Sequence, residues 1–359
     1  MSMEIARKFK LSAEPVSCER YGNGHINDTY LVCCADAHRY ILQRMNRTAF
    51  PNIEGLMGNI QSVTEYLAKD DPDGRHTLHL VHTLDDRVWY TDESGEAWRI
   101  YEFVERSVCF ERIEDPEDFY QSAIAFGGFQ RQLSGFPAHT LYEVIPGFHD
   151  TIIRYAQLRH AYLTDPLKRA ESAARELEFA WARENGAGVL VEGLRSGALP
   201  TRVTHNDTKL NNVLFDEATR QPLCIIDLDT VMPGAIAFDF GDSIRFGATT
   251  AAEDEPDLDK VHFSIDLFRA YARGFLKACG KAMDEHEVRS LADGARLMTL
   301  ECGIRFLADY LLGDVYFHIA YPEHNLIRCR TQLKLVVEME AQKQQMIDIL
   351  LQEWKVAIN

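Results

Sequence analysis

The stretch Thr204-His205-Asn206-Asp207-Thr208-Lys209-Leu210-Asn211-Asn212, followed by Ile225-Ile226-Asp227-Leu228-Asp229, decides the fold of this chain. Asp207 stands five residues before Asn212 and twenty before Asp227. In order, these residues are a candidate base, a neutral oxygen ligand and a hard anionic ligand. Transfer of a phosphoryl group from a magnesium nucleotide to a hydroxyl needs this set. The sequence therefore predicts that Asp207 is catalytic and that Asn212 and Asp227 bind magnesium.

The neighbours of these residues have less specific interpretations. A lone Asp in a loop is usually structural, because its side chain bonds its own backbone, and only the spacing favours catalysis for Asp207. His205 is expected to hold the loop by hydrogen bonds to backbone. Asp229 is left open between the metal site, a substrate hydroxyl and solvent. Asp239 is expected to cap the helix that follows it or to bond the catalytic loop.

A glycine-containing turn near the N-terminus is the second motif. Residues 21–27 read Tyr-Gly-Asn-Gly-His-Ile-Asn before a strand, and Gly22 and Gly24 are able to bring backbone N–H groups close to phosphates. Such turns are common, so the motif alone is weak. Tyr101 and Phe103 lie where the two halves of the chain meet. Their backbone groups are candidates for an adenine edge, with packing of a buried strand as the equal alternative.

Composition limits the class of protein. The chain has 359 residues, 46% of them hydrophobic and 26% charged, and a formal charge of -17. The length suits two lobes, and the charge argues against a nucleic-acid or anionic-membrane partner. We expect neither a signal peptide nor a membrane span, because the sequence has no apolar stretch of the length that either needs. Its eight cysteines have no C-x-x-C spacing. We expect a cytoplasmic monomer with reduced thiols.

The elements predicted along the chain change character after about residue 115. Strands are predicted at 29–33 and 39–43, joined by a turn, and again at 213–215 and 223–226. This order predicts an α+β fold with a β-rich lobe over 1–104 and a mostly helical lobe over 105–359. Helical spacing is found at 55–69, 119–133, 151–163, 165–184, 263–279, 285–312 and 325–354.

At these motifs the chain resembles the aminoglycoside phosphotransferase and choline kinase-like family, whose members are small-molecule kinases. The resemblance covers the 205–212 loop, the Ile226-Asp227 step and the segment 238–242. It implies a two-lobed, protein kinase-like fold, ATP and Mg as cofactors, and Asp207 as the base. Within the family a closer resemblance extends along nearly the whole chain. It implies an N-acetylhexosamine acceptor, phosphorylated at its anomeric hydroxyl.

One position departs from the family pattern. Many members carry Lys or Arg on the third strand, where it holds the α- and β-phosphates. Here Gln43 stands at that position and Arg44 follows it. Because strand side chains alternate between faces, only one of the two is expected to meet phosphate. Which one does so is left open.

The sugar pocket is expected in the helical lobe. An acetamido sugar is recognised by planar donors and acceptors and by a stacking aromatic ring. Candidates are Arg305, Asp309, Tyr316 and Arg328, with Asp229 as a further substrate contact. Arg305 and Asp309 are four residues apart on one helix, so a plain ion pair is the alternative.

Three other functions compete with this interpretation. The first is a kinase of the same family for an aminoglycoside, an amino alcohol or another sugar. The second is a nucleotide-binding protein without catalysis, which would lack the base or a metal ligand. The third is a metal-dependent hydrolase, which normally uses histidine-rich ligand sets. The thirteen histidines form no H-x-H or H-x-x-x-H cluster.

Overall fold

The computed structural model describes residues 2–22, 26–110, 113 and 115–359. The chain forms two units. The first unit takes in Met1–Cys109, Gly135–Ile145 and Val213–Met232. The second takes in Phe110–Ser134, Pro146–Asn212 and Pro233–Asn359. The division expected after residue 104 stays a prediction; the first unit continues to residue 109 and includes two later segments of the chain.

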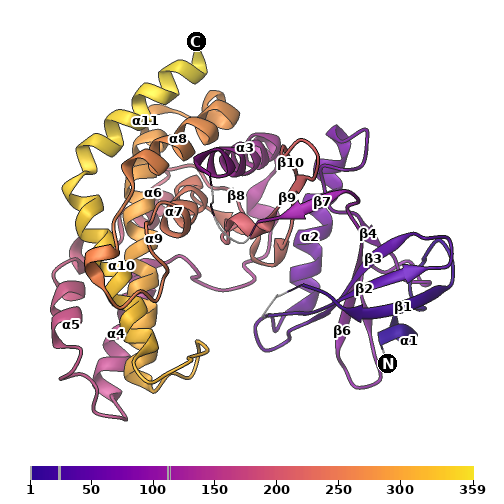
Figure 1. The fold of residues 1–359 in the computed structure, drawn as a ribbon, viewed down its shortest axis with the longest axis horizontal. Helices are drawn as coiled ribbons and strands as arrows, with labels where there is room; N and C mark the ends of the chain where they lie inside the picture. Colours follow the sequence, from indigo (N-terminus) through magenta and orange to yellow (C-terminus); the bar gives the residue numbers. More distant parts are fainter. Residues whose placement is uncertain (1, 23–25, 111–112, 114) are drawn as a thin grey trace. The chain divides into compact units, whose positions relative to one another are not determined.

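The first unit is built on an antiparallel sheet (Figure 1), in which the strands are joined in the order β1-β2-β3-β6-β4 and β5 pairs with β6. A smaller sheet has the order β10-β9-β7. The strands predicted at 29–33 and 39–43 are confirmed as β2 and β3. The elements are α1 Ser2–Ala6, β1 Pro15–Arg20, β2 Asp28–Cys34, β3 Arg39–Met45, β4 Leu80–Val81, β5 Tyr90–Thr91, β6 Ala97–Glu102, β7 Ser107–Cys109, β9 Val213–Asp216 and β10 Pro222–Ile225.

One face of the main sheet packs against α1, and the other, called here the polar face, carries a row of polar side chains beside apolar ones, because side chains alternate along each strand. Leu42 of β3 and Ile100 of β6 belong to the buried cluster that also contains residues of α1. On the other face, the register places Thr29, Gln43 and Arg99 in one row across β2, β3 and β6. Burial of the apolar side thus fixes which side chains face the polar side.

The helix α2 (Ile53–Leu67) connects separate parts of the first unit. Asn52 caps its N-terminus. The buried Asn59 amide donates to the carbonyl oxygens of Tyr142, at 2.7 Å, and Val231, at 2.9 Å. One helix residue therefore holds both of the later segments that belong to this unit.

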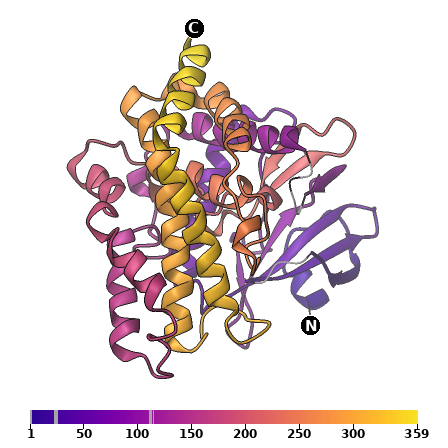
Figure 2. The ribbon, with the colours of Figure 1, turned by 60° about the vertical axis from the view of Figure 1, so that its left-hand side comes forward.

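The second unit is mostly helical (Figures 1 and 2). The 28-residue helix α9 packs against α4, α7 and α10, and both views show α9 and α10 side by side. In this unit β8 (Arg202–Thr204) pairs with β11 (Met232–Gly234), the strand through which the chain re-enters it. The helices are α3 Pro116–Gln132, α4 Thr151–Thr164, α5 Ala174–Trp181, α6 Val189–Ser196, α7 Ile236–Gly247, α8 Ile265–Cys279, α9 Glu285–Leu312, α10 His324–Ala341 and α11 Lys343–Ile358.

The helices α7 and α9 touch backbone to backbone. A Cβ atom added at Gly294 of α9 would lie 2.2 Å from the carbonyl oxygen of Ala237. One added at Gly241 of α7 would lie 2.3 Å from the carbonyl oxygen of Gly294. No side chain fits at either glycine without a shift of the backbone. The crossing therefore fixes the position of α7, which bears Asp239.

Several helix predictions are confirmed and two are wrong. The helix predicted at 285–312 has those bounds, because Asp284 and Glu287 form a capping box at its start. Of 165–184, only Ala174–Trp181 is α-helical; the segment begins with a turn, because the Asp165 carboxylate accepts from the backbone amides of Arg169 and Ala170. The segment predicted as one helix at 325–354 is α10 and α11, divided at Gln342. The α+β class is confirmed.

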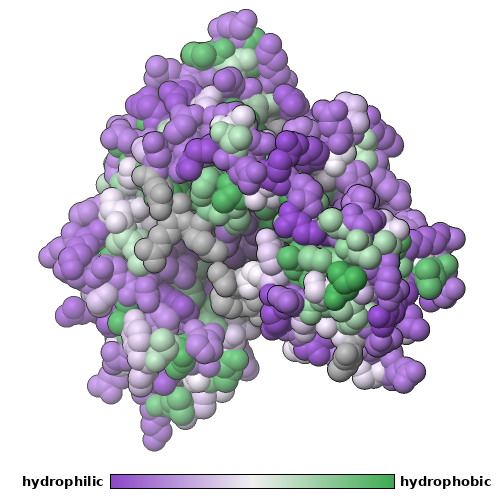
Figure 3. Space-filling view, turned by 45° about the vertical axis from the view of Figure 1, so that its right-hand side comes forward, coloured by the Kyte–Doolittle hydropathy of each residue, from purple (hydrophilic) through white to green (hydrophobic). Residues whose placement is uncertain are grey.

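The visible surface is largely polar. On the face in Figure 3, hydrophilic residues predominate and apolar residues are scattered among them. No helix in the described part of the chain is long and apolar enough to cross a membrane.

Candidate active site

A buried carboxylate on α7 holds the loop that follows β8. Asp239 is fully buried and accepts hydrogen bonds from the backbone amides of His205, at 2.9 Å, and Asn206, at 2.8 Å. The side-chain amide of Gln130 donates to it at 2.7 Å. Burial raises the pKa of Asp239, and these donors, together with His205, oppose the rise. The expectation that Asp239 bonds the loop is confirmed; it lies within α7 and does not cap it.

A second carboxylate on α7 holds the next residues of the loop. Asp242 accepts from the backbone amide of Thr208 at 3.0 Å and pairs with Arg245 at 2.9 Å. Burial opposes ionisation of Asp242, but the charges of Arg245 and Lys209 outweigh it and hold its pKa below the usual range. Ser243 also donates to the Thr208 carbonyl at 2.9 Å. Asp239, Asp242 and Ser243, all on α7, therefore hold the loop.

Asp207 projects from this fixed loop and is partly exposed. Its Oδ1 lies 2.7 Å from the Lys209 ammonium. The Asn212 amide nitrogen donates to the Asp207 carbonyl at 2.8 Å and to its Oδ2 at 3.2 Å. Burial disfavours the charge on Lys209, but the Asp207 carboxylate outweighs it and raises the lysine pKa. Asp207 is thus held beside a cation, and Asn212 is left with its amide oxygen for another ligand.

Two histidines support the loop. His205 is buried, and its Nδ1 accepts from the Asp207 backbone amide at 3.3 Å. This confirms its expected role in holding the loop by backbone hydrogen bonds. The His149 ring lies 2.9 Å from Glu301 through Nδ1 and 3.3 Å from the Asn206 carbonyl through Nε2. No local sequence motif marks His149, because it lies 57 residues from Asn206 in the chain.

Asp227 and Asp229 belong to the first unit. Asp227 follows β10 and has φ of 60°, in the left-handed region that L-residues rarely adopt. Such strain is kept where the surroundings demand one conformation. Asp229 is buried, with Oδ1 2.5 Å from Nη1 of Arg99 and Oδ2 accepting from the Asn27 amide at 2.6 Å. Both Asp229 oxygens thus have partners within this unit.

The nucleotide candidates of the first unit lie on different surfaces. Gly22 has φ of +73°, as a tight turn requires, and Gly24 lies outside the described residues. Gln43 lies on the polar face of the sheet, where Nε of Arg99 donates to its Oε1 at 2.9 Å. Arg44 lies on the opposite face and pairs with Asp28. Of the two, only Gln43 shares the polar face.

The adenine-edge candidates are engaged in the sheet. The backbone amide of Phe103 donates to the Arg39 carbonyl at 3.1 Å, and the Phe103 ring contacts the Arg39 guanidinium at 4.1 Å. Tyr101 is buried on β6, and within the described part of the chain its hydroxyl has no hydrogen-bond partner. The adenine-edge role of these two residues stays a prediction.

The sugar candidates lie near the C-terminal end of α9. Arg305 lies over three rings, with its guanidinium 5.6 Å from Phe148, 5.8 Å from Tyr316 and 5.4 Å from Phe317. It forms no ion pair with Asp309 among the described residues, although the sequence spacing allows one. The Arg328 guanidinium lies 5.5 Å over Phe306, whose ring centroid is 4.6 Å from that of Phe317.

Asp309 organises the turn that follows α9. Its carboxylate accepts from the backbone amides of Val315, at 3.0 Å, Tyr316, at 2.8 Å, and Phe317, at 2.9 Å. The Asn325 amide donates to it at 3.0 Å. The carboxylate therefore holds the backbone that carries the exposed Tyr316 ring.

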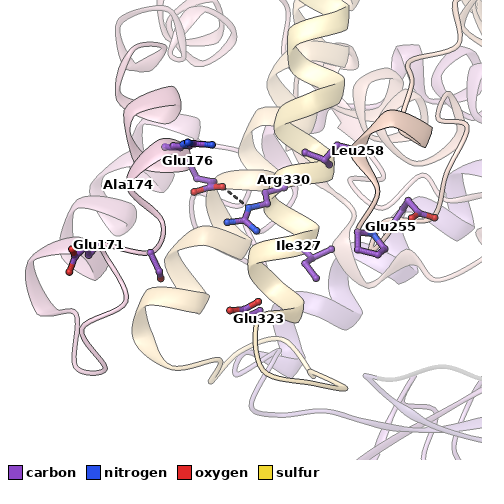
Figure 4. A pocket seen from close by; sticks show the side chains of 11 residues that line it. Glu171, Ala174, Glu176, Glu255, Leu258, Glu323, Ile327 and Arg330 are labelled. Atoms are coloured by element: carbon purple, nitrogen blue, oxygen red, sulfur yellow. Dashed lines mark hydrogen bonds and ion pairs between the residues drawn. The ribbon is translucent and has the colours of Figure 1, made fainter.

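A separate pocket of about 740 Å³ lies between α5, α10 and the 255–258 segment (Figure 4). Its lining includes four glutamates and two arginines, and Arg330 crosses it to pair with Glu176 at 2.6 Å. None of the residues predicted for catalysis, nucleotide or sugar lines it.

A known protein family matches most of this chain. The phosphotransferase enzyme family matches residues 17–274, well over half of the chain. The chain belongs to this family. It is therefore a phosphotransferase, as the motifs predict.

Solved structures support the fold of this phosphotransferase. An aminoglycoside phosphotransferase from Alicyclobacillus acidocaldarius is 14% identical with a TM-score of 0.61, and the match covers 99% of this chain and 97% of that one. A choline kinase from Cryptosporidium parvum is 14% identical with a TM-score of 0.59, over 98% of each chain. An amicoumacin kinase in complex with AMP-PNP and Ca²⁺ is 12% identical with a TM-score of 0.62, over 95% and 92%. The protein kinase-like fold is thereby confirmed.

Proposed function

We propose that this phosphotransferase is an N-acetylhexosamine 1-kinase, which transfers the γ-phosphoryl group of ATP to the anomeric hydroxyl of N-acetylglucosamine or N-acetylgalactosamine. The family accounts for phosphoryl transfer to a small molecule. The choice of a neutral sugar as acceptor is supported by the charges that lie near the Asp207 loop.

The proposal depends on two arginines that contact the same aromatic ring. The guanidinium groups of Arg154 and Arg305 lie 5.9 Å and 5.6 Å from the centroid of the Phe148 ring. His149, the next residue, contacts the carbonyl of Asn206, one residue before Asp207. Burial lowers the pKa of Arg154; the Glu301 carboxylate opposes this and the Arg305 charge adds to it. Positive charge beside Arg154 is therefore already unfavourable, because Arg305 lies close to it.

This arrangement favours a neutral acceptor over a cationic one. Choline-like and aminoglycoside acceptors carry positive charge, which two arginines repel. A sugar with an acetamido carbonyl and several hydroxyl groups offers acceptors to guanidinium N–H donors. The Tyr316 ring is 72% exposed and held in place through Asp309, so it is available to pack against the apolar side of a hexose ring.

The catalytic steps need little covalent chemistry from the protein. We propose that Asp207 accepts or orients the proton of the anomeric hydroxyl, which is more acidic than the other sugar hydroxyls. Lys209 keeps the Asp207 carboxylate in one position. Alignment of the acceptor with the γ-phosphate contributes most of the rate in such reactions.

Asn212 and Asp227 are the candidate ligands of a magnesium ion. We propose that Asn212 offers its amide oxygen and Asp227 its carboxylate, the oxygen ligands that Mg²⁺ prefers. The hydrogen bonds from the Asn212 nitrogen to Asp207 leave the oxygen as the atom for the cation. When bound, the ion would neutralise charge on the β- and γ-phosphates.

A ³¹P NMR experiment tests the acceptor directly. Enzyme, MgATP and N-acetylglucosamine are expected to give ADP and a phosphate resonance coupled to the anomeric proton. A parallel panel contains N-acetylgalactosamine, glucose, choline and an aminoglycoside. Transfer to choline or the aminoglycoside, with none to either acetamido sugar, would overturn the proposal. Absence of transfer to every acceptor would favour a nucleotide-binding protein without catalysis.

A charge-reversal pair tests the role of the arginines. Arg305→Glu is expected to lower kcat/KM for N-acetylglucosamine by at least about tenfold, since it removes a charged donor and adds repulsion for hydroxyl oxygens. Arg289→Glu is the matched control, because Arg289 lies on the same helix in an exposed pair with Glu285. Equal effects of the two changes would contradict a role for Arg305 in the acceptor pocket.

A further inference from the structure

The polar face of the main sheet contains a continuous chain of hydrogen bonds. Gln43 donates through Nε2 to Oγ1 of Thr29 at 3.1 Å and accepts through Oε1 from Nε of Arg99 at 2.9 Å. The register pairs these three residues directly across β2, β3 and β6. Gln43 therefore has a hydrogen-bond partner on each neighbouring strand, and its amide fixes the position of the Arg99 side chain.

The chain of bonds continues into the segment after Asp227. Nη1 of Arg99 lies 2.5 Å from Oδ1 of Asp229, and the other Asp229 oxygen accepts from the Asn27 amide at 2.6 Å. Asn27 also accepts from the backbone amide of Asn46 at 3.0 Å. The Arg99 guanidinium thus lies between the strand after the glycine turn and the turn after Asp227, all within the first unit.

Arg99 is an unusual residue to find here. Its side chain is 1% exposed, and buried arginines are rare unless paired. Its Nε donates to Gln43 and its Nη1 is in an ion pair with Asp229, yet Nη1 is a buried nitrogen without a hydrogen-bond partner within the described part of the chain. A guanidinium has five N–H donors in a fixed fork that matches phosphate oxygens. Donors therefore remain for a ligand.

A neighbouring hydroxyl points to a ligand independently. The Arg99 guanidinium lies 5.1 Å from the Tyr101 ring, and the Tyr101 hydroxyl is buried without a partner among the described residues. Burial raises the pKa of Tyr101; Arg99 opposes the rise, and Asp229 and Asp227 add to it. The hydroxyl therefore stays a donor, and a buried donor without an acceptor is costly unless a ligand supplies one.

We propose that Arg99 on β6 supplies the positive charge that meets the α- and β-phosphates of the nucleotide, with Gln43 and Asp229 as its positioning residues. Many members of the family carry this cation on the third strand. In this chain the proposed cation is on β6. The Tyr101 hydroxyl is a second donor to the same phosphates. This inference rests on the proposed binding of ATP and does not depend on the identity of the acceptor.

Nucleotide binding without acceptor tests the proposal. Dissociation constants of ADP and of adenosine are measured by calorimetry on the full chain with Mg²⁺. Arg99→Met is expected to weaken ADP binding by at least about tenfold, the effect of one charge-assisted contact, and to leave adenosine within about twofold. Arg44→Met is the matched control, because Arg44 is exposed on the opposite face of the neighbouring strand.

A relocated charge separates contact from positioning. In Gln43→Lys/Arg99→Met the cation returns to β3, and ADP affinity is expected to recover at least in part. If Arg99→Met does not fold, Arg99→Met/Asp229→Asn leaves no unpaired buried charge and is measured instead, with Arg99→Lys beside it.

Several outcomes would overturn the proposal. ADP affinity unchanged in Arg99→Met, equal losses for ADP and adenosine, or a loss in Arg44→Met alone would each do so. If the wild-type chain binds no ADP, both this proposal and the kinase proposal fail. If the wild type binds ADP but transfers no phosphate to acetamido sugars, only the proposed acceptor fails.

Discussion

Asparagine in place of Asp239 tests how the Asp207 loop is held. The substitution keeps the size of the side chain and replaces one oxygen by an NH₂ group, which cannot accept a hydrogen bond. Oδ2 of Asp239 accepts from His205 and Gln130, and Oδ1 accepts from Asn206. The best orientation of the asparagine keeps its oxygen at Oδ2 and leaves the Asn206 amide facing a donor.

The cost follows from these three hydrogen bonds. An unsatisfied buried amide costs about 1–3 kcal/mol, and a neutral acceptor weakens each remaining bond by about 1 kcal/mol. Because burial raises the pKa of Asp239, loss of the ionised carboxylate returns part of its desolvation cost. We expect a net loss of about 2–4 kcal/mol, a large share of the 5–15 kcal/mol that stabilises an ordinary protein.

Urea unfolding and steady-state kinetics measure the effect. We expect Asp239→Asn to unfold at lower urea and to lose about 10²-fold in kcat, the scale of a misplaced catalytic group. Asp348→Asn, the same change on an exposed residue of α11, is the control. If the two variants have equal stability and wild-type kcat, the Asp239 carboxylate does not hold the loop as described.

Three further predictions concern single residues. Asp207→Ala is expected to lower kcat by about 10²-fold or more while ADP binding persists; near wild-type turnover in an ADP-release assay would contradict its role as base. Gly294→Ala is expected to cost about 1–3 kcal/mol in urea unfolding, whereas Gly58→Ala, where an added Cβ meets nothing within 4 Å, is expected to be neutral or stabilising. The lowered pKa of Asp242 predicts stability that is present above the usual Asp pKa of about 3.9 and is lost as pH falls through the folded value. The stability difference between wild type and Asp242→Asn should therefore shrink from pH 7 to pH 3, and a constant difference would show that Asp242 is not linked to folding.

The local parts of the fold were predictable from the sequence. The 285–312 helix was predicted to its bounds because its cap and apolar spacing are both local signals. The contact of Asp239 with the Asp207 loop was one of two roles expected for it, and the other, capping of the helix, is wrong because Asp239 lies within α7. The turn at Asp165 was missed because the surrounding residues favour helix, and only the hydrogen bonds of one carboxylate show where it breaks.

Long-range partners were not predictable. Arg99 stands in a strand whose pattern is that of buried packing, and only the register of three strands places it beside Gln43. Asp309 was expected to pair with Arg305 or to contact substrate, but its oxygens accept from a turn six to eight residues later. His149 reaches the Asp207 loop from 57 residues away, and no local signal marks that contact.

The contact of α7 with α9 limits how this sequence is able to change. The two helices are in close contact at Ala237, Gly241 and Gly294. A larger residue at any of these positions requires α7 to move. Because α7 also bears Asp239, such a move would displace the Asp207 loop. Among diverging descendants of this chain, we expect these three positions to vary together or not at all, although none of them touches a reactant.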